Sequence, residues 1–95
     1  MTERIPTSLP PDLIKYAESR EFSATDTPQK LLSSHRTKVG TWGLLCVIAG
    51  VVDYVVGDRC YAVRAGETVV IEPDVEHFVR PSSNARFKVE FYRAS

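Results

Sequence analysis

Long hydrophobic runs, closely spaced cysteines and an excess of one charge are all missing from this 95-residue sequence. The longest apolar run covers residues 43–52, about half the length of a membrane-spanning helix. Twelve Lys and Arg balance twelve Asp and Glu, so the formal net charge is zero. Proteins that follow a nucleic-acid backbone or an anionic membrane carry a basic excess. The sequence therefore disfavours nucleic-acid and membrane partners.

The cysteines and the N-terminus indicate the cellular compartment. Cys46 and Cys60 are too far apart for a Cys-x-x-Cys redox or zinc motif. We expect both to be free thiols, buried or half-buried, as a reducing compartment would keep them. The first residues include an acidic Glu3 and no apolar segment of signal-peptide length, so we expect a cytoplasmic location.

Proline and turn-forming residues divide the chain. Residues 1–12 hold three of the six prolines and predict an irregular N-terminal arm, which leaves residues 13–95 as a single domain. Up to residue 32 we expect short strands or one weak helical turn. After Gly40, short runs rich in β-branched and aromatic residues alternate with turn residues. These runs predict strands at 41–49, 51–56, 59–64, 68–71, 77–80 and 86–92.

Short strands without a long helix between them predict an antiparallel sandwich or barrel, and a closed barrel leaves no exposed edge strands. In the last strand Phe87, Val89 and Phe91 share one face, whereas Lys88 and Glu90 share the other. The apolar face belongs to the core. The polar face can border solvent or a lumen, and the alternation leaves both interpretations open.

Two segments carry motifs. Residues 35–43 read His-Arg-Thr-Lys-Val-Gly-Thr-Trp-Gly, and residues 66–77 form a strand pattern that ends in Glu-Pro and is followed by a histidine. Both resemble the cupin domain at the N-terminus of tellurite-resistance B (TehB-like) proteins. The resemblance implies an all-β fold, a small cupin-type double-stranded β-helix (jelly-roll) barrel, over residues 13–95. It also implies a role related to tellurite resistance or stress response, performed by the cupin part alone.

The resemblance further implies a divalent transition metal in the barrel, with zinc or iron expected. The general cupin pattern has two histidines one residue apart, then a glutamate, and later a third histidine. Here Thr37 stands at the second histidine and Gly43 at about the glutamate. His35 and His77 remain as candidate metal ligands, and any metal needs further ligands.

A carboxylate is the expected third ligand, because two imidazoles and one carboxylate form a recurrent open site for Zn²⁺ or Fe²⁺. Glu72 is the first candidate and Glu90 the second. Each has an alternative interpretation: Glu72 can point to solvent, and Glu90 can form ion pairs on the outer face of the barrel.

Lys38 and Trp42 are the candidate ligand-binding residues. A cation near a metal can hold a small anionic ligand, whereas Trp42 suits the wall of a barrel mouth or a core anchor. The leading hypothesis is a stand-alone metal-binding barrel for a small anionic or oxidised ligand. The alternatives are a metal-dependent enzyme, such as an oxygenase or isomerase, and a metal-free dimeric interaction module. We expect a homodimer in each case.

Overall fold

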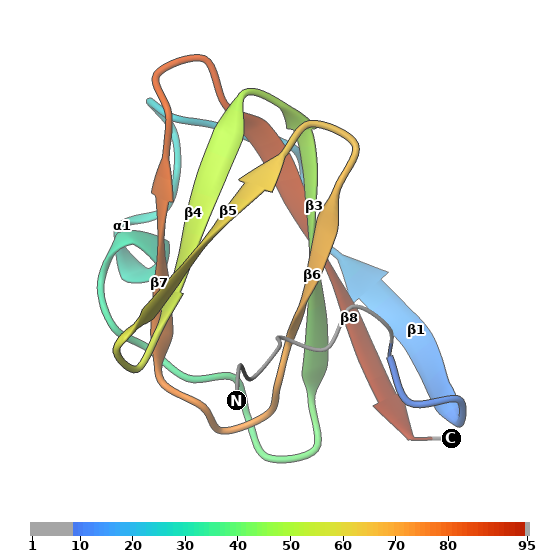
Figure 1. The fold of residues 1–95 in the computed structure, drawn as a ribbon. Coiled ribbons are helices and arrows are strands. Elements are labelled where there is room, and N and C mark those ends of the chain that lie inside the picture. The colour runs from blue at the N-terminus through green and yellow to red at the C-terminus, as the bar shows by residue number, and fades with distance from the viewer. Residues whose placement is uncertain (1–8, 95) are drawn as a thin grey trace, which may run out of the picture.

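The computed structural model describes residues 9–94, so most of the predicted arm at 1–12 lies outside the described residues (Figure 1). Within residues 9–94 the chain forms eight strands and one short helix, α1 (Gln29–Leu32). The strands are β1 (Leu13–Glu18), β2 (Phe22–Ser23), β3 (Trp42–Ala49), β4 (Val51–Val56), β5 (Arg59–Arg64), β6 (Thr68–Ile71), β7 (His77–Pro81) and β8 (Arg86–Ala94).

The strands form two antiparallel sheets that face each other (Figure 1). One sheet has the order β1-β8-β3-β6, and β2 also pairs with β8. The other has the order β5-β4-β7. The segment from Phe22 to His35 connects the sheets, because Phe22 pairs with Phe87 of β8 and His35 forms a bridge with His77 of β7.

A glycine turn carries the chain from the first sheet into the second. Gly50 lies between β3 and β4 and has a φ of +68°, a left-handed conformation that favours glycine. A Cβ atom there would lie 2.8 Å from the Ala85 Cα, so backbone as well as conformation excludes a side chain. This turn therefore fixes the position at which β3 ends and β4 begins.

Apolar side chains on the inner faces of both sheets build one core. The alternation along each strand turns every second side chain inward. Leu45 and Phe87 come from the first sheet and Val52 and Tyr54 from the second, and all four are at most 2% exposed. The rings of Phe22 and Phe87 pack with their centroids 5.6 Å apart, which joins β2 to the core. The interior is therefore built from aromatic and branched side chains.

The predicted architecture is confirmed. All six strands expected after residue 40 form, and their ends shift by no more than two residues. The alternation in β8 is also confirmed, since Phe87 and Val89 are buried and Phe91 packs against the core. The protein is an all-β, cupin-type jelly-roll barrel with antiparallel sheets.

The cysteine prediction is correct in one part and wrong in another. Cys46 and Cys60 are both free, and Cys46 is half-buried as expected. Cys60 is exposed, because it lies on β5, an edge strand whose outer face nothing in residues 9–94 covers. Burial raises the pKa of the Cys46 thiol, and the nearby Glu90 raises it further.

Candidate ligand-binding site

The structure brings His35 and His77 together across the barrel. Their backbones form a two-way bridge, in which His35 N donates to His77 O at 3.0 Å and His77 N donates to His35 O at 2.9 Å. Pro73 ends β6, because a proline cannot donate to a strand ladder. Asp74 then takes a positive φ of 56°, and the resulting turn delivers His77 to the start of β7.

The two imidazole rings have their centroids 4.3 Å apart and meet edge to face. The Nδ1 atom of His35 lies 3.0 Å from the Ser33 carbonyl oxygen, and that of His77 lies 2.9 Å from the Val75 carbonyl oxygen. A carbonyl oxygen only accepts, so each Nδ1 carries a proton. In the neutral form of either ring the lone pair therefore lies on Nε2. Both Nε2 atoms can therefore accept a hydrogen bond or bind a metal.

His77 is the more deeply enclosed of the pair, at 3% exposure. Burial lowers the pKa of His77, and the adjacent His35 lowers it further, whereas the hydrogen bond to Val75 raises it. The Tyr54 ring lies 5.4 Å from the His77 ring, and burial followed by the charge of Glu72 raises the pKa of the Tyr54 phenol. Both His77 and Tyr54 are therefore uncharged at neutral pH.

A cavity of about 270 Å³, here called the inner chamber, lies beside the histidines. Apolar side chains form most of its wall, with His35, His77 and Thr37 among the few polar contributors. The apolar part of the wall comes from both sheets and from the connecting segment, and includes Phe22, Leu31, Leu45, Ile71, Val79, Phe87, Val89 and Phe91. The inner chamber is thus continuous with the hydrophobic core.

A second cavity of about 430 Å³, here called the outer chamber, adjoins the first. The two chambers share a wall made by Lys30, Leu31, His35, Thr37 and Phe91. The outer chamber adds Tyr16 from β1 and three residues from the loop after His35, namely Arg36, Lys38 and Thr41. Its wall is therefore more polar than that of the inner chamber, and it carries three basic residues.

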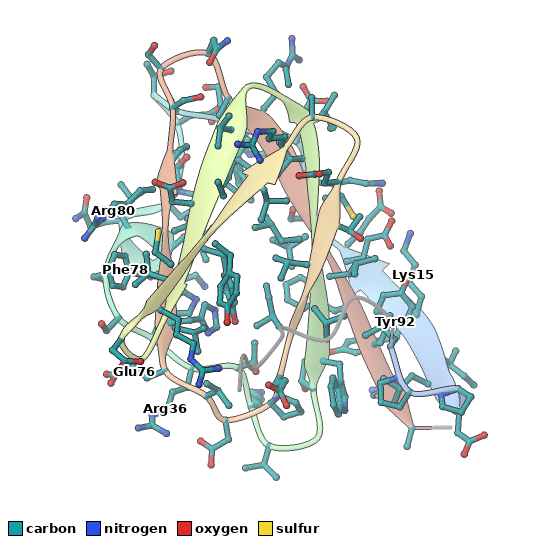
Figure 2. All side chains as sticks on the ribbon, viewed as in Figure 1. Lys15, Arg36, Glu76, Phe78, Arg80 and Tyr92 are labelled. Atoms are coloured by element: carbon teal, nitrogen blue, oxygen red, sulfur yellow. The ribbon has the colours of Figure 1, made fainter. Side chains whose placement is uncertain are left out.

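The basic residues of the outer chamber differ in their partners. Arg36 donates from Nη1 to the Asp74 carbonyl oxygen at 3.1 Å and lies 3.6 Å from the Asp74 carboxylate. Figure 2 shows Arg36 at the lower end of the molecule. The side chains of Lys30 and Lys38 form no hydrogen bond or ion pair with any residue between 9 and 94. Two lysines thus line this chamber without an acidic partner in the described chain.

Glu72 does not join the histidines as predicted. Its side chain is exposed, and its backbone carbonyl oxygen accepts a hydrogen bond from Thr37 Oγ1 at 3.3 Å. Across residues 9–94, no three or more His, Cys, Asp or Glu side chains gather closely enough to hold a metal ion. Residues 9–94 therefore offer a divalent ion two imidazole nitrogens and no nearby carboxylate, so coordination by three ligands from these residues does not fit.

Glu90 lies on the outer face of β8, away from the histidines, because Val89 and Phe91 take the inner face. Its carboxylate accepts hydrogen bonds from Tyr92 OH at 2.8 Å and from Lys15 Nζ at 3.2 Å, and Lys88 Nζ lies 3.3 Å away. Figure 2 shows Lys15 and Tyr92 together on the β1 side of the barrel. Glu90 therefore forms ion pairs on the outer face of the barrel, as its alternative interpretation predicted. This position does not fit a metal ligand that acts together with the histidines.

The two predicted ligand-binding residues have different positions. Lys38 lines the outer chamber. Trp42 is half-buried, lines neither chamber and lies opposite Tyr92 of β8. Strand alternation explains this position, because Gly43 and Leu45 take the buried face of β3 and Trp42 therefore takes the other. Trp42 is a wall residue of the outer face and not part of this site.

The sequence analysis missed Lys30, Leu31 and Phe91 as lining residues. Lys30 and Leu31 lie on α1, whose four residues are too few to produce a helical pattern. Phe91 was assigned to the core, and it does pack there while its exposed edge borders both chambers. In the sequence, only the apolar pair Leu31-Leu32 after a polar stretch indicates that this segment packs against the barrel.

Two facing antiparallel sheets with the strand orders β1-β8-β3-β6 and β5-β4-β7 define the class of the protein, a small jelly-roll barrel. The chain belongs to the TehB-like domain family, whose family model matches residues 18–89. No helix among residues 9–94 is long and apolar enough to cross a membrane. No curated protein sequence matches the chain.

Solved structures agree with this assignment. A protein from Escherichia coli K12 superposes with a TM-score of 0.87 at 20% identity, over 93% of this chain and 97% of that one. TehB from Haemophilus influenzae superposes with a TM-score of 0.83 at 25% identity, over 88% of this chain but 32% of that one. The present chain thus spans about a third of that TehB. A cupin-2 domain protein from Shewanella frigidimarina gives a TM-score of 0.44 at 20% identity, over 97% of this chain and 78% of that one.

Proposed function

We propose that this TehB-like barrel binds a small anionic ligand in the outer chamber, with Lys30 and Lys38 supplying the positive charge. The observation that carries the proposal is the pair of lysines in one cavity without an acidic partner among residues 9–94. A cavity lined by charge of one sign concentrates counter-ions, since its low-dielectric walls focus the field. Following the likeness to TehB, we place this binding in a cytoplasmic response to tellurite or a related stress.

Titration by NMR with tellurite, acetate and hexanoate tests the proposal in the full-length protein. At least one of these anions should bind at the outer chamber and bind more weakly when salt rises from about 0.05 M to about 0.5 M. A K30Q/K38Q variant should lose most of the affinity. The matched control K15Q/K88Q removes two lysines from the outer face of the sheet and should keep it. Failure of every anion to bind, or equal losses in the two variants, would overturn the proposal.

A second candidate is a divalent transition metal, zinc or iron, held by His35 and His77. The favouring observation is that both Nδ1 atoms are fixed to carbonyl oxygens, which aims the Nε2 lone pairs as metal-binding histidines require. The remaining ligands would have to be water or the anion, because the described residues supply no third one. When bound, such an ion would supply a Lewis acid.

Elemental analysis after reconstitution of untagged protein with zinc or iron tests this candidate. One equivalent per chain is expected for the natural sequence and for E90Q, whose carboxylate lies on the outer face. Loss of the metal is expected in H35A/H77A. Less than about a tenth of an equivalent in the natural protein would contradict the metal and would leave the anion proposal intact, since the lysines act without it.

A further inference from the structure

The two adjoining chambers differ in chemical character. Lys30 and Lys38 line the outer chamber without an acidic partner among residues 9–94. Lys30 also borders the inner chamber, whose wall otherwise consists mostly of core residues such as Leu45, Val79 and Phe87. Their shared wall includes Leu31 and Phe91, so an apolar surface begins where the basic surface ends. One small molecule can therefore touch both surfaces at once.

The inner chamber does not suit a bare oxyanion. Moving a charge from water into an apolar wall costs free energy unless hydrogen bonds replace the lost hydration, and few polar atoms line this chamber. An apolar cavity of about 150 Å³ in another protein is large enough for benzene. At about 270 Å³, the inner chamber has room for a ring or a short alkyl chain.

We propose that the ligand is an amphipathic monocarboxylate, with its alkyl or aryl tail in the inner chamber and its carboxylate beside Lys30 and Lys38. The proposal rests on the proposed function, because the same lysines hold the charge. The new element is the apolar tail of the ligand, for which the inner chamber provides the binding surface. His35 and Thr37 border both chambers and stand where the head and tail of such a ligand would join.

A homologous series measures the tail directly. Acetate, butanoate and hexanoate carry the same charge and differ only in methylene groups, so NMR titration of the full-length protein separates tail from head. The affinity should rise about three- to fourfold for each methylene that enters the chamber. Hexan-1-ol has a comparable tail without the charge and should bind more weakly than hexanoate.

Variants of Val79 locate the tail. Val79 is 4% exposed on β7 and lines the inner chamber but not the outer one. V79F should fill the chamber and reduce hexanoate binding to the level of acetate, while acetate binding stays unchanged. V79I adds a single methyl group and should reduce the hexanoate preference in part, which keeps the test valid if V79F does not fold.

The outcomes separate the two proposals. Acetate, tellurite and hexanoate binding with equal affinity would overturn the amphipathic ligand and leave a small-anion site standing. Hexan-1-ol binding as tightly as hexanoate would remove the role of the lysines and overturn both. No binding by any member of the series, together with none by tellurite, would also overturn both. A chain-length preference that survives V79F and V79I would place the tail elsewhere and contradict this inference.

Discussion

Two pairs of lysines in this barrel have opposite surroundings. Lys15 and Lys88 lie on the outer face of the β1-β8-β3 sheet, where each contacts both Glu18 and Glu90. Lys30 and Lys38 border the outer chamber and contact no acidic side chain within residues 9–94. The formal net charge of the chain is zero, but the charges are not evenly distributed. Positive and negative side chains are paired on the outer face, whereas the two lysines at the outer chamber are unpaired within the described chain.

The difference shows which charges belong to the fold. On the outer face the hydrogen bond from Lys15 lowers the pKa of Glu18, and the hydrogen bond from Tyr92 lowers that of Glu90 ahead of the two lysines. Folding and protonation are therefore linked there. The chamber lysines form no ion pair within residues 9–94, so their charge remains available to a ligand.

The largest expected effect contrasts the inner and outer faces of β8. Phe87 is 0% exposed and packs against Phe22, so Phe87→Ala should lower the free energy of unfolding by about 3–5 kcal/mol. Urea denaturation monitored by circular dichroism measures it. The control is Lys88→Ala, one residue along and on the outer face, for which the loss should be far smaller. Similar losses at the two positions would contradict the division between a structural inner face and a charged outer face.

The next effect concerns a polar group inside the barrel. His77→Leu removes the donor to the Val75 carbonyl oxygen in a nearly inaccessible place and should lower the free energy of unfolding by about 1–3 kcal/mol. The control is His77→Asn, whose amide N–H can reach the same carbonyl and should restore part of that loss. If the leucine variant is as stable as the natural protein in urea, the hydrogen bond does not support the turn.

The sequence predicted the sheet well because its signals are local. The alternation of Phe87, Val89 and Phe91 needs only neighbouring residues, and a turn glycine such as Gly50 marks a strand end by itself. The pairing of His35 with His77 came from a resemblance to a family. No local pattern in either segment requires the two to meet.

The electrostatic contrast could be predicted only in part. Lys38 stands out through its motif, whereas nothing in the sequence separates Lys30 from Lys15 and Lys88. Register decides the difference: Glu18 lies opposite Glu90 in the β1-β8 pair, and that pairing gathers both carboxylates around two of the lysines. The positions of the two candidate carboxylates could not be predicted for a similar reason. Strand alternation in three dimensions places Glu90 outside the barrel, and the turn after Glu72 leaves that side chain exposed.

A smaller effect is the acid sensitivity of the outer face. The folded-state pKa values of Glu18 and Glu90 are both lowered, so the two carboxylates stabilise the fold above their unfolded pKa of about 4.3, and this stabilisation is lost as the pH falls through the lower folded values. Thermal melts between about pH 6 and pH 3 should show a falling midpoint. Glu90→Gln should flatten that fall, because one of the linked groups is gone. An unchanged slope in this variant would show that other carboxylates cause the acid sensitivity.

The smallest expected effect is the one that separates the lysine pairs most directly. K15Q/K88Q breaks the contacts to Glu18 and Glu90 and should lower the thermal midpoint by up to about 4 °C, the range of exposed ion pairs in a small domain. K30Q/K38Q breaks no side-chain hydrogen bond or ion pair within residues 9–94 and should leave the midpoint unchanged. A drop in the second variant equal to that in the first would mean that the chamber lysines stabilise the fold. Added hexanoate should raise the midpoint of the natural protein and of K15Q/K88Q, but not of K30Q/K38Q, because only a ligand that binds the native state stabilises it.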